Sequence, residues 1–325
     1  MASEDNKNIK EIFTTNQHKP TRKKKNLRTT ISYGSCGSWL TLLFLFLLIS
    51  CHTTPITSDT IFEKMEYVPL DNNGFAYIFT NVKEARPILD ILPIQQLKNW
   101  QANLILENTE MAAAALFSRE SGRRFQVAGW GNYPSLRARV ALFFNTTWKR
   151  QRSVSGAYWS SAVQKISVVI NPKQVFAVAW HDTHVNPVPA SSGVKMPEGF
   201  AQFIRGAALS CWMESPALIL NQILVSQGIP INLPAEQLFL KLNPRNGNQY
   251  EVLIRLRFEN AAQARTIAGV LALANAFSVN QQSLMASIFF ANPPVLDGRN
   301  IDIKTALLSE KEITLLLQMF LLYWK

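Results

Sequence analysis

Cysteine is scarce in this 325-residue sequence, which contains only Cys36, Cys51 and Cys211. Cys36 and Cys51 flank an apolar leader, so Cys211 has no second cysteine in the rest of the chain with which to form a disulfide. A domain of this size must then be stabilised by its apolar core instead of by cross-links. Because Cys211 lies in an apolar stretch, we expect a buried and unreactive thiol.

Motifs of the common enzyme classes are also absent. The sequence has no glycine-rich phosphate loop, no G-x-S-x-G elbow, no H-E-x-x-H and no Cys-x-x-Cys. Residues 181–184, His-Asp-Thr-His, are the one cluster of candidate metal ligands, but they lead into a proline-rich loop without an identifiable fourth ligand. The aromatic turn at 129–134, which precedes an expected helix, is the other candidate for ligand contact. We therefore expect no enzymatic activity, no cofactor and no metal.

No apolar run reaches the roughly 20 residues of a membrane-spanning helix. The run at 39–51 is about half that long and follows a basic segment, as in a secretory signal peptide. It ends in Leu48-Ile49-Ser50-Cys51, which matches a bacterial lipobox. We therefore predict that the Cys51 thiol takes a diacylglycerol, that the chain is cleaved just before Cys51 and that the new amino terminus is acylated. The alternative is an uncleaved signal anchor. The predicted parts are a signal peptide at 1–50, a lipidated tether at 51–66 and a single domain at 67–325.

Positive charge exceeds negative charge by 11 over the whole chain, and five of these charges lie in residues 1–50. We interpret the remaining excess of six positive charges as modest and spread along the chain. It suits contact with anionic lipid headgroups. No cluster of basic and aromatic residues indicates a nucleic-acid surface.

Two segments resemble each other within the chain. Residues 79–92 and 258–271 share six identical positions, and each follows an alternating apolar segment. Asn81 and Asn260 stand where a helix N-cap is expected. We predict a duplicated strand–helix unit with copies at about 67–150 and 236–325; chance similarity between two helix starts is the alternative.

Strands are expected between these copies, where Val, Ile, Phe, Tyr and Trp are frequent. A hairpin is expected from 237–242 to 249–258, with its turn at Asn246-Gly247. Runs of strands alternating with helices predict an α+β fold, an antiparallel sheet flanked by amphipathic helices. The other expected strands are 124–130, 157–162, 165–170 and 174–180.

Residues 199–226 have apolar side chains at helical spacing and predict two amphipathic helices, the second beginning after Ser215-Pro216. Residues 313–324 predict a helix that is apolar nearly all round and needs a cover. Such faces pack on a sheet or lie in a membrane interface. The candidate membrane-binding residues are Phe200, Phe203, Ile204, Ala207, Trp212, Leu218, Ile219 and Ile223.

The lipobox and the layout of strands and amphipathic helices resemble the treponemal outer-membrane-associated lipoproteins. That resemblance implies an acyl anchor at Cys51 in the periplasmic leaflet of the outer membrane, with helices that enter the bilayer and alter its permeability. Membrane lipids are then the expected partners, nucleic acid is not, and a homo-oligomer is left open. The alternatives are a carrier of lipid or another hydrophobic ligand, an envelope assembly factor, and a purely structural envelope protein.

Overall fold

Antiparallel strand pairing dominates the computed structural model. It describes residues 65–85, 107–189, 193–226, 232–245, 249–278 and 292–323, all within the larger of the chain's two units, residues 35–325. In these residues, one 13-stranded sheet has the order β13-β14-β12-β11-β10-β2-β3-β4-β8-β7-β6-β5, and β15 pairs with β12. A separate two-stranded ladder joins β1 to β9.

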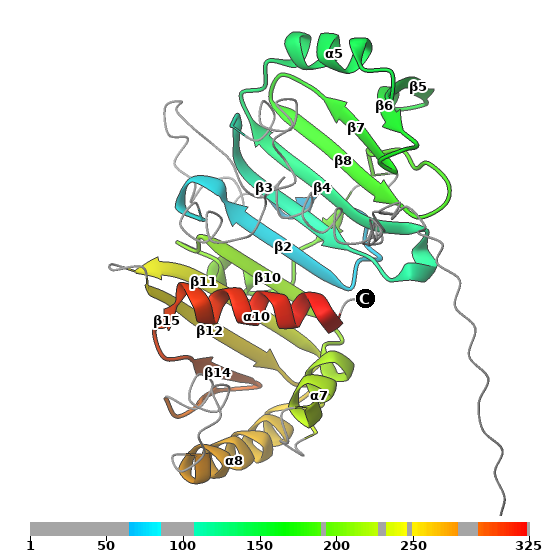
Figure 1. The fold of residues 1–325 in the computed structure, drawn as a ribbon. Helices are drawn as coiled ribbons and strands as arrows, with labels where there is room; N and C mark the ends of the chain where they lie inside the picture. Colours follow the sequence, from blue (N-terminus) through cyan, green and yellow to red (C-terminus); the bar gives the residue numbers. More distant parts are fainter. Residues whose placement is uncertain are drawn as a thin grey trace, which may run out of the picture. The chain divides into compact units, whose positions relative to one another are not determined.

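One half of the sheet comes from the earlier part of the chain (Figure 1). Its inner strands are apolar on both sides because both faces of the sheet are covered. The alanines of β3 at 112–115 are an example, since all four are fully buried. The bounds are β2 Ala76–Asn81, β3 Thr109–Leu116, β4 Arg123–Gly131, β5 Lys149–Ser153, β6 Gly156–Ser161, β7 Ile166–Ile170 and β8 Gln174–Trp180, with the ladder β1 Tyr67–Val68 and β9 Val194–Lys195.

The other half comes from the later part of the chain and joins the first through β10, which pairs with β2 from Leu209 opposite Thr80 to Met213 opposite Ala76. The sheet is therefore continuous across strands that are far apart in sequence. The bounds are β10 Leu209–Glu214, β11 Gln237–Arg245, β12 Gln249–Arg257, β13 Val295–Asp297, β14 Asn300–Lys304 and β15 Leu308–Ser309.

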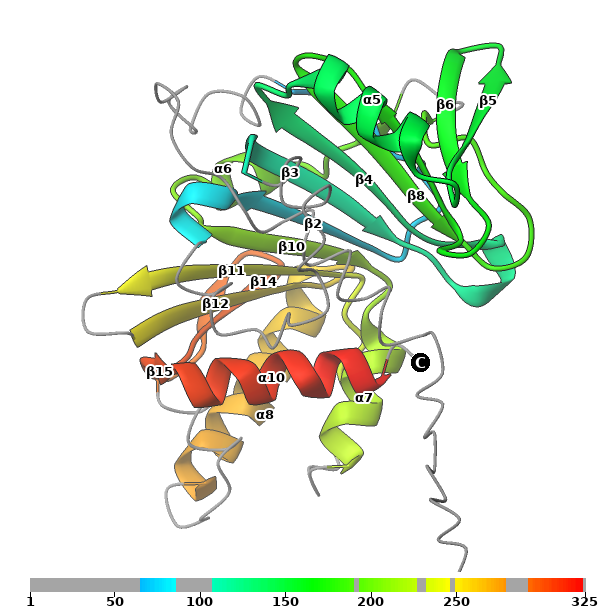
Figure 2. The same cartoon turned by 45° about the horizontal axis from the view of Figure 1, so that its top comes forward.

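The described helices divide between the two faces of the sheet. Side chains of α5 (Ser135–Phe144), α7 (Ala217–Ser226), α8 (Ala261–Ser278) and α10 (Glu310–Tyr323) share one apolar core. The short α6 (Phe200–Phe203) and the β1–β9 ladder cover the opposite core. In Figure 2, α10 lies along the first face near β12 and β15, which it contacts. One further short helix, η3, spans Arg119–Ser121.

The α+β fold and its antiparallel sheet are confirmed, as are all four strands expected between residues 124 and 180. The hairpin is confirmed as β11–β12, whereas its turn at Asn246-Gly247 lies outside the described residues. Both N-caps are present: the side-chain oxygens of Asn81 and Asn260 accept from Glu84 N at 3.4 Å and Gln263 N at 2.9 Å. The predicted duplication stays a prediction.

The helix expected from Phe200 through Cys211 is wrong beyond its first turn. Helix α6 ends at Phe203, and Gly206, at φ +64°, turns the chain into β10. Cys211 and Trp212 therefore lie on a strand in the middle of the sheet, because backbone pairing with β2 and β11 outweighs the helical spacing of the apolar residues. The second expected helix is confirmed as α7, and the C-terminal helix as α10.

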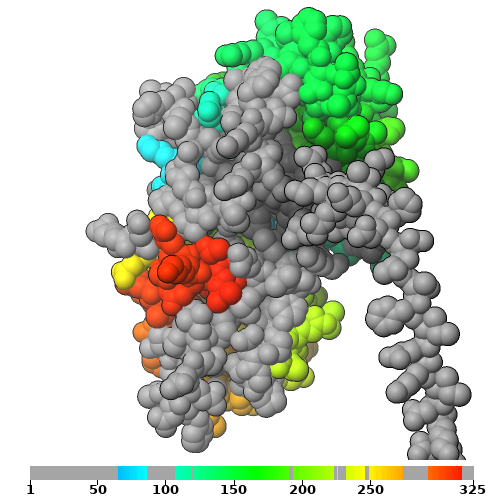
Figure 3. Space-filling model, viewed as in Figure 1, coloured from blue at the N-terminus to red at the C-terminus, as the bar shows by residue number. Residues whose placement is uncertain are grey.

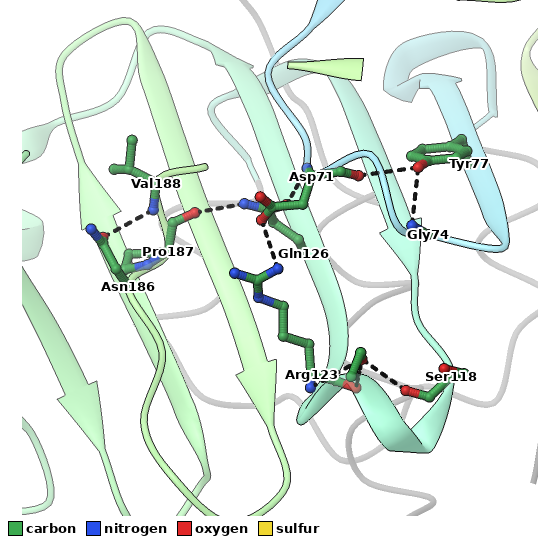
Figure 4. A network of polar contacts seen from close by, with 10 residues as sticks. Asp71, Gly74, Tyr77, Ser118, Arg123, Gln126, Asn186, Pro187 and Val188 are labelled. Atoms are coloured by element: carbon green, nitrogen blue, oxygen red, sulfur yellow. Dashed lines mark hydrogen bonds and ion pairs between the residues drawn. The ribbon is translucent and has the colours of Figure 1, made fainter. Parts of the chain in front are cut away.

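A polar network fixes two loops over the α6 face of the sheet (Figure 4). The fully buried Gln126 on β4 accepts from Asp71 N at 2.8 Å and donates to the Pro187 oxygen at 3.0 Å. Arg123 forms an ion pair with Asp71 at 3.2 Å, and the Tyr77 hydroxyl donates to the Asp71 carbonyl oxygen at 3.1 Å. Buried polar groups are thereby satisfied where two loops cross the core.

Candidate membrane-binding surface

Helix α5 has two apolar sides, of which only one faces the sheet. It begins after Pro134, whose carbonyl oxygen accepts from Ala138 N at 2.9 Å. The small residues Ala138 and Ala141, with Leu142, are buried against the strands. Four larger side chains are instead exposed on the other side: Leu136 at 77%, Val140 at 45%, Phe143 at 70% and Phe144 at 76%.

These four positions follow the spacing i, i+4, i+7, i+8, which places them on one stripe of a helix that turns about 100° per residue. Arg137 and Arg139 flank that stripe on either side, since each is about 60° or more from its centre. An outward apolar stripe bordered by cations is typical of a helix that lies in a membrane interface. We call it the α5 stripe.

Further cations lie on the neighbouring edge strand β5. Arg150 is opposite Trp159 and Arg152 opposite Ala157 in the β5–β6 register. Because Trp159 packs against the core beneath α5, the two arginines project on the same face of the sheet as that helix. Among the described residues, none of the four arginines of this surface, Arg137, Arg139, Arg150 and Arg152, forms an ion pair.

The reason is that this part of the chain has no carboxylates. Between Glu120 and Asp182 the sequence has nine Lys or Arg residues and no Asp or Glu. The interpretation that the positive excess is spread out is therefore wrong: it is concentrated in residues 121–181, and the rest of the chain from Cys51 onward is net acidic. Figure 3 shows atoms of this segment, in green, forming the surface at the top of the view.

Charged residues on an edge strand also prevent that strand from pairing with the sheet of another molecule. This role alone would explain the arginines of β5. It does not account for two exposed phenylalanines on α5. Their rings form an edge-on pair, with centroids 5.5 Å apart. A contiguous exposed apolar patch with a polar rim marks a surface that contacts a membrane or a partner.

Five of the membrane-binding residues expected from the sequence lie in or beside the opposite core. Phe200, Phe203, Ile204 and Trp212 are all at least 92% buried, and Ala207 is partly buried. The rings form an aromatic cluster, which consists of Tyr77, Phe79, Phe200, Phe203, Trp212 and Phe239.

Contacts within the aromatic cluster are close. Tyr77 stacks on Trp212 at 4.3 Å, and Phe200 lies edge-on to Trp212 at 5.3 Å. Arg255 lies over the Phe203 ring at 5.3 Å and is held by two 2.6 Å hydrogen bonds to Asp302. Entry of these rings into a bilayer would require the core around the central strand β10 to open.

The remaining candidates lie on α7. Leu218 is 70% exposed and Ile219 is partly buried against the helical core. Ile223 falls within the helix, but its side chain lies outside the described residues. Cys51 also lies outside them, so its acylation stays a prediction.

Burial explains the chemistry of the groups that could react. The Cys211 thiol is buried, and its pKa is raised to about 12 because the thiolate would lose its hydration. The pKa of Tyr77 is raised to about 12 for the same reason.

The candidate metal ligands at 181–184 begin with a histidine that has a protein partner. The Nδ1 atom of His181 accepts from Arg124 Nε at 3.2 Å. No group of three or more potential metal ligands is present in the part of the chain that the structure describes.

Across the described ranges, no helix combines the length and apolarity that a membrane crossing requires.

Neither a family model nor a curated protein matches this sequence. Solved structures of TP0453 from Treponema pallidum do resemble the fold. Crystal form III is 14% identical with a TM-score of 0.55, covering 78% of this chain and 98% of TP0453. Crystal form I is 15% identical with a TM-score of 0.54, covering 81% and 100%. The similarity extends over the whole of TP0453, and at this identity it shows a shared fold.

Proposed function

We propose that this chain is a lipoprotein of the bacterial envelope, acylated at Cys51, that binds the surface of an anionic membrane through the α5 stripe and the arginines around it. The observation that carries the proposal is an outward apolar stripe inside a segment of nine cations and no carboxylate. The treponemal origin of the fold neighbours supports the resemblance seen in the sequence. The proposal assigns the chain no catalytic role.

The two contacts reinforce each other. The lipids on Cys51 hold the chain at the membrane, and each cation near an anionic surface adds about 1 kcal/mol. The tether at 52–66 spans about 50 Å when fully extended, so the lipid keeps the domain at high local concentration near the bilayer. In this arrangement the aromatic cluster stays in the core, and the membrane contact is peripheral.

Flotation on lipid vesicles tests the proposal with the mature chain, residues 51–325, carrying Cys51→Ser, which removes the acylation site. The chain should float with phosphatidylglycerol vesicles and much less with phosphatidylcholine vesicles, and added salt should weaken binding. A dye trapped in the vesicles should stay inside. Equal flotation with both lipids would refute an electrostatic contact.

Charge reversal locates the surface. Arg137→Glu with Arg150→Glu should weaken binding by at least about 2 kcal/mol, roughly thirtyfold. The control is Arg265→Glu on α8, an exposed helical arginine that has no exposed phenylalanine beside it among the described residues. If the control lowers binding as much as the double variant, the membrane contact does not lie at α5.

A further inference from the structure

Strands β6 and β7 separate at one end and leave an opening in the sheet. Their pairing stops at Trp159 opposite Val168, so residues 156–158 pair only with β5. The Ile170 carbonyl oxygen, which has no β6 donor, accepts from Arg139 Nη2 at 2.8 Å and Nε at 3.2 Å. The Arg139 guanidinium thus donates to the carbonyl oxygen that a paired strand would otherwise satisfy, and no described strand fills the opening beside it.

A cavity of about 580 Å³ occupies this opening, within the range of small-ligand sites. Trp159 packs with the core beneath α5, whereas Val169, Phe176 and Val188 belong to the opposite core. Since the lining comes from both faces of the sheet, the cavity extends through the split. Its apolar lining is Val140, Phe143, Trp159, Val169, Phe176 and Val188.

The far wall of the cavity is held in place by hydrogen bonds. Asn186 Nδ2 donates to Ser155 Oγ at 2.8 Å and to Ser153 Oγ at 3.2 Å, which ties the loop to the β5–β6 turn. The Asn186 side-chain oxygen accepts from Val188 N at 3.1 Å. These bonds and the Gln126 contact to Pro187 (Figure 4) fix the loop before any ligand arrives, which lowers the entropy cost of binding.

We propose that this cavity binds one acyl chain of an amphiphile with an anionic head group. The chain would lie among Val169, Phe176 and Val188, whose side chains offer it no hydrogen-bonding groups and require none. The head would lie at the α5 side, where Arg139 and Arg150 line the cavity. Arg139 keeps unused N–H donors after its two bonds to Ile170, and Arg150 forms no ion pair among the described residues.

This inference rests on the proposed function in one respect, the path by which the amphiphile reaches the cavity. Val140 and Phe143 belong both to the α5 stripe and to the cavity lining, so a membrane bound at the stripe would lie at the cavity entrance. The chain could come from a free fatty acid in water or from a phospholipid of the bound membrane. The chemistry is the same in both cases: an acyl chain inside the sheet and an anion beside two arginines.

Fluorescence of parinaric acid, a polyene fatty acid, tests the proposal with the mature chain, residues 51–325, carrying Cys51→Ser. One arm adds the free acid without vesicles, and the other adds vesicles containing a parinaroyl phospholipid. Ala157→Phe places a ring in the cavity from an exposed position on β6 and should lower binding at least tenfold while leaving vesicle flotation unchanged. Val154→Phe, at an exposed position outside the lining, is the matched control.

The head-group contact has its own readout. Binding of the anionic probe itself should fall about tenfold in Arg150→Gln. After correction for that lower probe affinity, the inhibition constant of palmitate should also weaken about tenfold, whereas that of hexadecanol, which has no charge, should stay unchanged. Binding that Ala157→Phe abolishes in either arm supports the cavity and identifies the source of the chain. Absence of binding in both arms, or binding that Ala157→Phe leaves intact, would overturn the proposal, whereas loss of flotation alone would count only against the membrane surface.

Discussion

Replacing both Phe143 and Phe144 by serine is the sharpest test of the α5 stripe. Complete burial of a phenylalanine side chain is worth about 1.5–3 kcal/mol. Because the fold leaves these rings 70% and 76% exposed, most of that free energy is still available for membrane binding. Allowing for partial depth in the interface, the two rings should contribute about 3 kcal/mol, so the double variant should bind roughly a hundredfold more weakly.

The measurement is the partition coefficient on phosphatidylglycerol vesicles, from flotation and from tryptophan fluorescence. Stability should change little, since the helix is held by Ala138, Ala141 and Leu142 on its other side. Leu273→Ser on α8, at a residue 61% exposed, is the control for loss of an exposed apolar side chain. A double variant that partitions like the parent chain, with an unchanged melting temperature, would show that the stripe does not enter the interface.

Three further predictions concern the fold. Gln126→Leu leaves Asp71 N and the Pro187 oxygen without their partner, so urea unfolding should report a free energy of unfolding lower by about 2–4 kcal/mol. The control Gln222→Leu, on the exposed side of α7, should lower it little. Equal losses in the two variants would contradict the role of the network. Gly131→Ala would bring a Cβ to 1.8 Å from the Asn108 oxygen, so circular dichroism should report a markedly lower melting temperature, and a wild-type value would refute that close approach. Since the pKa of Cys211 is about 12, a maleimide should label it at pH 8 only after unfolding. Stability should fall as pH rises above 9, where only the unfolded thiol ionises; rapid labelling of the native chain would contradict this.

The strands at 166–170 and 174–180 were predictable because Val, Ile and Phe are dense there and Asn171-Pro172 marks the turn. Strand β10 was not predictable. A central strand is apolar on both faces, so its sequence lacks the alternation of apolar and polar residues that identifies a strand. Its Cys211 also happens to continue the helical spacing from Phe200. The four alanines of β3 carry a helical propensity that pairing with two neighbours overrides.

The proposed membrane-binding surface was only partly predictable. The absence of carboxylates between Glu120 and Asp182 is visible in the sequence. The sequence does not show which side of α5 faces the sheet. Its periodicity identifies two apolar stripes, and the larger side chains would be expected to face the core. The structure buries the smaller one because Ala138 and Ala141 allow the helix to approach the sheet closely.

The pairing of β2 with β10 also determines the order in which this chain can fold. Strand β2 ends at Asn81, and its partner begins only at Leu209. During synthesis, the β2 edge that will pair with β10 therefore has no partner until about 130 residues beyond Asn81 have been made, and such edges invite pairing with other chains. Contacts this distant in sequence also slow folding. A nascent chain of this fold thus has a long interval in which a chaperone that shields β2 would prevent aggregation.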